Sequence, residues 1–179
     1  WFKPLTNLLY KSKNGRILID NSERYAYYSK AVISTLPHLF WVPDIFVCNG
    51  WQSALIPTIY KSEYEGINEF YNDIKTVLVI HDLDEYSTVN KSDLLNFGIK
   101  IPASLKGNKI NLYDVAIYSA DAVLIIDKPG AKISSKLLKK AAFKDNKNKL
   151  TIFDQKVNED VDYNTVTSSL DQIISKLTS

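Results

Sequence analysis

The amino-acid sequence predicts an α/β protein, a Rossmann-like parallel sheet with helices on both faces, and three observations carry this prediction. Apolar runs of strand length recur along the chain, at residues 43–48, 76–80, 122–126 and 150–153. Stretches with apolar residues at helical spacing separate these runs. The runs consist mostly of apolar residues, which is typical of strands buried on both faces of a parallel sheet. Strands that alternate with helices form βαβ units, whose crossovers are right-handed.

The first predicted elements are a helix and a strand. The chain up to about Gly15 contains turn-forming residues, and residues 20–23 (Asp-Asn-Ser-Glu) then offer capping side chains to a helix. Apolar residues follow at helical spacing until Pro37, which ends the predicted helix. The apolar run at 43–48 predicts the first strand, and Asn49 and Gly50 break it.

The remaining elements alternate in the same way. A helix is expected from Trp51, followed by a strand at 76–80 that ends at His81. The polar stretch 85–109 predicts a loop with one short helix. A helix at 110–120, a strand at 122–126, a helix at 132–143, a strand at 150–153 and a helix at 166–177 complete the order. We expect residues 1–179 to form a single domain that is incomplete at its N-terminus, because the chain begins with Trp1 and contains no methionine.

Composition excludes several classes of protein. Hydrophobic residues make up 45% of the chain and charged residues 23%, which argues against intrinsic disorder. The net charge of +2 comes from 22 basic and 20 acidic residues that are spread along the chain, so no nucleic-acid partner is expected. Apolar runs stay well short of the roughly 20 residues that cross a bilayer, so no membrane span is expected. Cys48 is the only cysteine, which favours a reducing compartment, and we expect a cytoplasmic protein.

The predicted sheet indicates where a ligand binds. Open α/β sheets bind ligands at the carboxyl ends of their strands. Three places meet this rule: residues 48–51, His81 with Asp82, and Asp127 with Lys128. An imidazole at the position of His81 can donate a hydrogen bond to a sugar hydroxyl or a phosphate oxygen, or it can transfer a proton. The alternative is a histidine that organises its own loop.

The junction after the first strand offers a second group of candidates, Asn49, Gly50, Trp51 and Gln52. Glycine permits close approach of the backbone to a ligand, although neither a GxGxxG nor a Walker pattern accompanies Gly50. Trp51 can stack on a sugar ring, but a tryptophan at the start of a buried helix more often belongs to the core, and we favour that interpretation.

Carboxylates follow the second strand, at Asp82, Asp84 and Glu85. A metal site is not expected there, because the sequence has no second histidine at ligand spacing. A glycosidase-type pair of carboxylates remains open, and a solvated loop is the favoured interpretation. Cys48 has no catalytic surroundings, no Gly-x-Ser-x-Gly elbow is present, and no cofactor is expected.

Four segments, taken in order, resemble the glycogen and starch synthase family. Residues 20–31 (Asp-Asn-Ser-Glu-Arg-Tyr-Ala-Tyr-Tyr-Ser-Lys-Ala) are similar to its Asp-Asn-x-x-Arg-Phe helix. Residues 43–55 (Pro-Asp-Ile-Phe-Val-Cys-Asn-Gly-Trp-Gln-Ser-Ala-Leu) resemble its Pro-Asp-Ile-…-His-Asp-Trp segment. Residues 75–83 (Lys-Thr-Val-Leu-Val-Ile-His-Asp-Leu) are similar to Lys-Thr-Val-Phe-Thr-Ile-His-Asn-Leu. Residues 109–112 and 118–123 resemble the family's Lys-Ile-Asn-Phe and Tyr-Ala-Asp-x-Val. Short, single-domain relatives of Bacteroidetes type are similar in extent.

The resemblance implies the N-terminal half of a GT-B glycosyltransferase, in which the active site lies between two Rossmann-like domains. It implies transfer of glucose from ADP-glucose or UDP-glucose to an α-1,4-glucan, with retention. His81 is the implied catalytic residue. The implied substrate-binding residues are Asn49, Gly50, Trp51, Gln52, Asp82 and Asn111. The resemblance assigns most of the nucleotide, and the basic residues that stabilise the leaving diphosphate, to a second domain for which this chain has no room.

The departures from the family pattern fall at positions expected to face the ligand. Asn49 and Gly50 replace the histidine and aspartate before the tryptophan, and Asp127 and Lys128 replace a Ser-Pro. Asp114 and Ala116 stand where the family has lysine and glycine. The family's Lys-x-Gly-Gly-Leu loop lies upstream of the matching region and is not among these 179 residues. Two functions therefore remain open: a glucosyltransferase domain, and a catalytically degenerate module that binds glucan or nucleotide sugar. A different sugar-phosphate enzyme on the same fold is a third.

Overall fold

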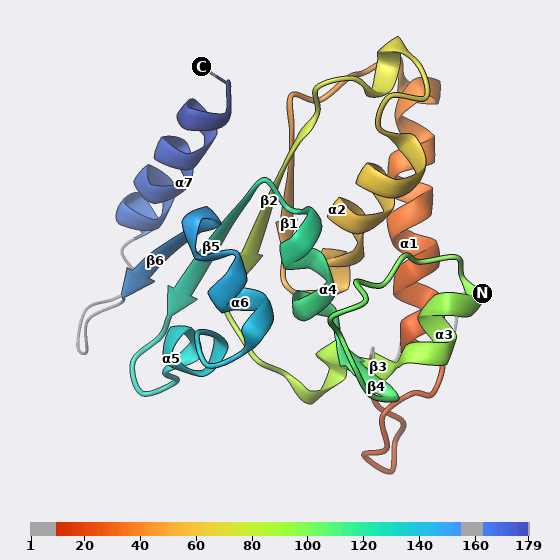
Figure 1. Cartoon of the computed structure of the whole chain (residues 1–179), viewed down its shortest axis with the longest axis vertical. Coiled ribbons are helices and arrows are strands. Elements are labelled where there is room, and N and C mark those ends of the chain that lie inside the picture. The colour runs from red at the N-terminus through yellow and green to blue at the C-terminus, as the bar shows by residue number, and fades with distance from the viewer. Residues whose placement is uncertain (1–9, 155–162, 179) are drawn as a thin grey trace.

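The computed structural model describes residues 10–154 and 163–178, and its centre is a parallel sheet (Figure 1). The four strands lie in the order β1-β2-β5-β6 and are β1 (Ile45–Asn49), β2 (Lys75–Ile80), β5 (Ala122–Asp127) and β6 (Leu150–Asp154). Every neighbouring pair is parallel, with Val47 beside Val77 and Val79 beside Leu124. All four strands predicted from apolar runs are confirmed.

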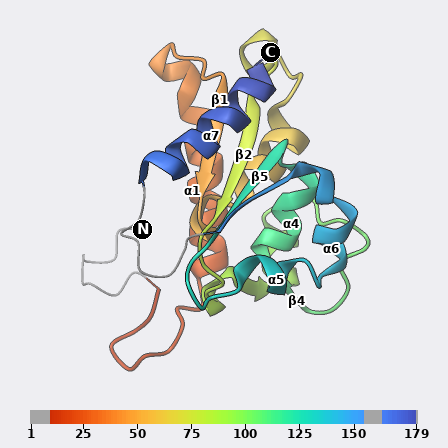
Figure 2. The same cartoon turned by 90° about the vertical axis from the view of Figure 1, so that its left-hand side faces the viewer.

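Helices cover both faces of the sheet, but unequally. The helices are α1 (Asn21–Thr35), α2 (Leu55–Ile59), α3 (Lys91–Asn96), α4 (Leu112–Ser119), α5 (Ile133–Leu137), α6 (Ala141–Asp145) and α7 (Tyr163–Thr178). In Figure 2, α7 crosses one face of the sheet while α1 and α4 lie behind it. The larger core includes Leu78 and Ile125 on the α1 and α4 face, and the smaller core joins Val77, Val79 and Leu124 to Ile173 of α7.

Three segments differ from the sequence prediction. Residues 88–90 and 109–111 form an antiparallel pair, β3 (Thr88–Asn90) and β4 (Lys109–Asn111), where a loop was expected. The expected short helix there is α3. The predicted helix at 132–143 is wrong as one element, because it divides into α5 and α6. Lys140 lies at this division, and its ammonium pairs with the Asp114 carboxylate of α4 at 2.9 and 3.0 Å.

Candidate functional site

The candidate site is a surface at the carboxyl ends of β1 and β2, where His81 and Gly50 lie side by side. The sheet brings them together because Asn49 pairs with Val79, and the Gly50 N–H donates to the Val79 carbonyl at 2.9 Å. A Cβ added to Gly50 would lie 3.4 Å from His81 Nε2. The same atom would lie 2.7 Å from Gln52 Oε1. Three of the sequence-predicted residues therefore converge on one point.

His81 is held by its neighbour in the chain. His81 Nδ1 lies 3.2 Å from Asp82 Oδ2, and the histidine side chain is one-third exposed. When Nδ1 donates to Asp82, Nε2 is left as the nitrogen that faces Gly50 and the solvent. A carboxylate in this position fixes the tautomer and orientation of an imidazole.

Asp82 is in turn held by Tyr113, a residue that the sequence interpretation missed. The buried Tyr113 hydroxyl donates to Asp82 Oδ1 at 3.2 Å. Burial raises the pKa of Tyr113, and the charge of Asp82 raises it further, so the phenol keeps its proton. Tyr113 belongs to α4, far along the chain from His81. A polar hydroxyl on an apolar helix face was the only signal for this residue in the sequence.

The carboxylates after β2 make this surface acidic. Burial raises the pKa of the Asp84 carboxyl, and the neighbouring Asp82 charge adds to the effect. His81 and Lys128 act in the opposite direction on the same group. No cluster of three or more histidine, cysteine, aspartate or glutamate side chains suited to a metal ion occurs within residues 10–154 and 163–178.

Trp51 and Gln52 contact a cluster of aromatic side chains. Trp51 is fully buried, and its ring centroid lies 4.7 Å from that of Tyr25 and 5.2 Å from that of Tyr10. The indole therefore belongs to the core, the place favoured from the sequence, and a substrate role for it stays a prediction. Gln52 Nε2 donates to the Tyr10 hydroxyl at 2.9 Å, which positions the amide oxygen close to Gly50.

Asn111 and Asp127 have polar side chains that are used within the fold. Asn111 Oδ1 accepts from the Tyr113 N–H at 3.0 Å, and its Nδ2 donates to Ser87 Oγ at 2.8 Å. Asn111 thus caps α4 and holds the loop after β2, and its predicted contact with substrate is untested. Asp127 accepts from the Ile133 N–H at 2.6 Å and from the Ser134 hydroxyl, so it caps α5.

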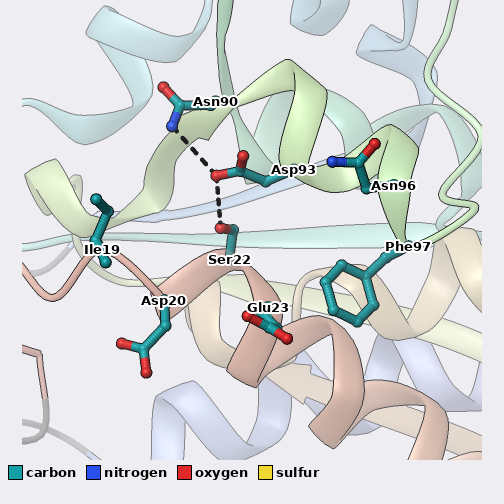
Figure 3. A pocket seen from close by; sticks show the side chains of 8 residues that line it. All are labelled: Ile19, Asp20, Ser22, Glu23, Asn90, Asp93, Asn96 and Phe97. Carbon is teal, nitrogen blue, oxygen red and sulfur yellow. Dashed lines mark hydrogen bonds between the residues drawn. The ribbon is translucent and has the colours of Figure 1, made fainter.

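A separate hollow of about 530 Å³ lies between the start of α1 and α3 (Figure 3). Its polar centre is Asp93, whose carboxylate accepts from Ser22 at 3.0 Å and from Asn90 at 3.2 Å. The bond from Ser22 joins α1 to α3, two elements about seventy residues apart in the chain. The strand-end residues described above do not line this hollow.

With this geometry described, comparison with known proteins gives the family. A family model for the starch synthase catalytic domain matches residues 2–132, well over half of the chain. The chain belongs to the starch synthase catalytic domain family. This membership confirms the resemblance drawn from the four ordered segments, and with it a glycogen or starch synthase-like glycosyltransferase domain.

Individual proteins similar to this chain are glycogen synthases, in agreement with the family model. The chain is 31% identical over 130 residues to a glycogen synthase of Lachnoclostridium phytofermentans, a match that covers 71% of the chain and 27% of that protein. It is 47% identical over 64 residues to a glycogen synthase of Clostridium perfringens, covering 36% of the chain and 13% of that protein.

A solved structure shows the same fold. The catalytic domain of starch synthase IV from Arabidopsis thaliana matches 78% of the chain at a TM-score of 0.61 and 18% identity. The match covers 30% of that structure's chain. Each of these matches thus covers less than a third of the matched protein. Within the described residues, no helix is long and apolar enough to cross a membrane.

Proposed function

We propose that this chain forms part of a glucosyltransferase that moves glucose from ADP-glucose or UDP-glucose to an α-1,4-glucan. The observation that carries the proposal is the placement of His81 Nε2 over Gly50, with Asp82 fixing the other ring nitrogen. Structural similarity to a starch synthase domain bound to ADP and acarbose supports the choice of a nucleotide donor and a sugar acceptor. A cytoplasmic location is part of the same proposal.

The charge of the surface favours a particular part of the donor. Asp82, Asp84 and Glu85 accept hydrogen bonds from hydroxyl groups, whereas their charge repels a diphosphate. We therefore assign the transferred glucose and the acceptor end to this surface. The diphosphate then lies against positive groups outside it, where they stabilise the leaving group.

In this arrangement each residue has a limited task. His81 Nε2 accepts a hydrogen bond from a hydroxyl of the transferred glucose, and Asn49 binds a second hydroxyl. Gly50 has no side chain, which leaves room for the sugar beside the imidazole. In the transfer, the bond from C1 to the phosphate oxygen breaks, a bond from C1 to the acceptor oxygen forms, and the acceptor proton passes to the leaving phosphate.

The test is transfer of labelled glucose from ADP-glucose and from UDP-glucose onto glycogen, with the full-length gene product. We expect His81→Ala to lower kcat/KM by about 10²–10³-fold, the scale of losing one polar group aimed at a reacting substrate. His38→Ala is the matched control, because His38 lies in the turn after α1, away from the strand ends. Equal activity of His81→Ala and the unsubstituted protein contradicts the role of His81.

The second candidate is a degenerate module that binds glucan or nucleotide sugar without transfer. Asp127 stands where the family has a Ser-Pro at the ligand edge, and its carboxylate caps α5 instead of facing a ligand. This use of Asp127 within the fold favours the degenerate module. Glycogen binding without incorporation of labelled glucose from either donor supports this candidate. Incorporation from one of the two donors excludes it and identifies the nucleotide.

A further inference from the structure

The Tyr113 hydroxyl lies where the two strand-end turns of the candidate site meet. Tyr113 is in the first turn of α4, is fully buried and belongs to the larger core. Its hydroxyl donates to Asp82 Oδ1 at 3.2 Å, in the turn after β2. Burial raises the pKa of this phenol most, whereas the backbone N–H of Trp51 lowers it, so the same oxygen also faces the turn after β1. One hydroxyl therefore lies beside both turns.

The carboxylate of Asp82 has three polar partners within the part of the chain that the structure describes. Its Oδ2 lies 3.2 Å from His81 Nδ1. Its Oδ1 accepts from the Asp84 N–H at 3.4 Å and from the Tyr113 hydroxyl. His81 and Asp84 belong to the same short loop as Asp82, so they do not fix this carboxylate relative to the sheet. Tyr113 is the partner that is anchored outside the loop.

His81 depends on such an anchor. Residues 81–84 form no helix or strand, and the imidazole side chain is one-third exposed. An exposed side chain on a loop changes its rotamer rapidly unless hydrogen bonds hold it. The two bonds from Tyr113 to Asp82 and from His81 to Asp82 tie the imidazole to the buried core, with Nε2 on the side of Gly50.

The residue type at position 82 suits this arrangement. The family segment that these residues resemble has an asparagine there, whereas this chain has Asp82. A carboxylate accepts hydrogen bonds on both of its oxygens, whereas a side-chain amide accepts on one. Asp82 can therefore accept from His81 and from Tyr113 at the same time, and its charge strengthens both bonds.

We propose that Tyr113 is a positioning residue, whose hydroxyl orients His81 through Asp82 and so holds Nε2 toward the sugar. The part that concerns the sugar rests on the glucosyl transfer proposed above. Tyr113 does not touch the substrate in this arrangement. It supplies the rigid support that a reacting group on a loop requires.

The first measurement is the ¹⁵N spectrum of the imidazole nitrogens, recorded on the full-length gene product at mildly alkaline pH, where imidazole is neutral. The nitrogen chemical shifts separate an imidazole with its proton on Nδ1 from one with its proton on Nε2. His38 and His81 are the two histidines of these 179 residues, and His81→Ala identifies the His81 signals. We expect the Nδ1–H form in the original protein and a mixture of both forms in Tyr113→Phe.

Tyr60→Phe is the matched control. Tyr60 is also fully buried, and its hydroxyl donates to the Tyr71 carbonyl at 2.7 Å and accepts from the Ile74 N–H at 3.2 Å. Ile74 directly precedes β2, so these bonds lie at the opposite end of that strand from His81. Tyr60→Phe also removes a buried hydroxyl, but it should keep the Nδ1–H form of His81. A purely structural role of the Tyr113 hydroxyl gives the same His81 spectrum in both variants.

The second measurement is glucose transfer onto glycogen. We expect Tyr113→Phe to lower kcat/KM by about tenfold, the scale of one hydrogen bond to a charged group, while Tyr60→Phe leaves it unchanged. In a protein that already carries Asp82→Ala, Tyr113→Phe should cause no further loss, because its effect passes through Asp82.

Three results overturn the proposal: an unchanged His81 spectrum in Tyr113→Phe, a changed spectrum with unchanged kcat/KM, and an equal further loss of kcat/KM in the Asp82→Ala background. Absence of transfer by the original protein counts against the proposed function instead. The spectrum requires neither donor nor glucan, so it decides in that case too whether Tyr113 orients His81.

Discussion

Asp121 lies immediately before β5, and its side chain fastens the start of that strand to the start of β2. Asp121 Oδ2 accepts from the Thr76 N–H at 2.7 Å and from the Thr76 hydroxyl at 2.9 Å. Lys61 Nζ lies 3.3 Å from the other carboxylate oxygen. This position corresponds to the aspartate of the family's Ala-Asp-x-Val segment, and the bonds give it a structural role at the edge opposite the candidate site.

Removal of the Asp121 carboxylate should leave the Thr76 N–H without its acceptor. We expect Asp121→Ala to lower the free energy of unfolding by about 1–3 kcal/mol, the cost of an unsatisfied buried donor. Chemical denaturation measures this change. Asp171→Ala, on the exposed side of α7, is the control and should stay within about 0.5 kcal/mol of the original protein. An equal loss in both variants contradicts the role of Asp121.

Cys48 is the only thiol, and the structure makes it unreactive. Burial raises the pKa of the Cys48 thiol to about 12, so almost no thiolate exists at neutral pH. We expect a disulfide reagent to modify Cys48 at pH 8 only as fast as the protein unfolds. Rapid modification of the folded protein contradicts this burial.

The same thiol affects stability at alkaline pH. An unfolded thiol loses its proton near its ordinary pKa of 9.0, whereas the folded thiol keeps its proton up to about 12. The folded state then binds more protons, so the free energy of unfolding falls as pH rises through this window. The slope contributed by Cys48 is about 1.4 kcal/mol per pH unit. Cys48→Ala should show a shallower decline between pH 9 and 12.

At the scale of elements, the turn after β1 depends on glycine. Gly50 has φ 74° and ψ 177°, a backbone conformation that residues other than glycine rarely adopt. The turn ends β1 and begins the helical segment that carries Trp51 into the core. The same residue therefore closes the strand and keeps the space in front of His81 open.

Gly50→Ala should disturb both the turn and the site. Backbone strain costs about 1–2 kcal/mol, and the new methyl group pushes Gln52 and approaches His81. We expect lower stability together with a larger KM for the glucan or the donor. Gly130→Ala is a matched control, because Gly130 has φ 76° but no atom within 4 Å of an added Cβ. The same KM in Gly50→Ala and Gly130→Ala would show that the space at Gly50 is not used.

The elements that the sequence predicted well are those with long apolar patterns. The four sheet strands follow apolar runs of four to six residues, and α1 follows apolar residues at helical spacing. The pair β3 and β4 was missed, since each strand has three residues and their partner lies about twenty residues away. The division of 132–143 was missed because neither glycine nor proline marks it.

At the scale of the whole molecule, the chain order of the strands predicted that His81 and the residues after β1 meet at one edge, and they do. The contact that positions them was not predictable in the same way. Tyr113 reaches Asp82 from α4 only because β2 and β5 are adjacent and α4 packs across them. Side-chain contacts between distant elements depend on the assembled fold, and the pattern of a single sequence does not predict them.

Among the described elements, one face of the sheet is covered by α7 alone. Ile173 is 5% exposed and completes the small core with Val77, Val79 and Leu124. We expect Ile173→Ala to lower the free energy of unfolding by about 2–5 kcal/mol, as for other large-to-small changes in a core. Ile67→Ala, at an exposed position, should change it by less than about 0.5 kcal/mol. Thermal denaturation of both variants checks this, and equal melting temperatures contradict the dependence on α7.

The strand order β1-β2-β5-β6 follows the order in which the ribosome makes the strands. Each new strand can pair with the one synthesised just before it, so the sheet grows from one side as the chain emerges. Among the described elements, the helix that shields the second face is synthesised last. Until α7 leaves the exit tunnel, the nascent protein displays Val77, Val79 and Leu124 to solvent, and exposed apolar surface of this kind favours aggregation or capture by a chaperone.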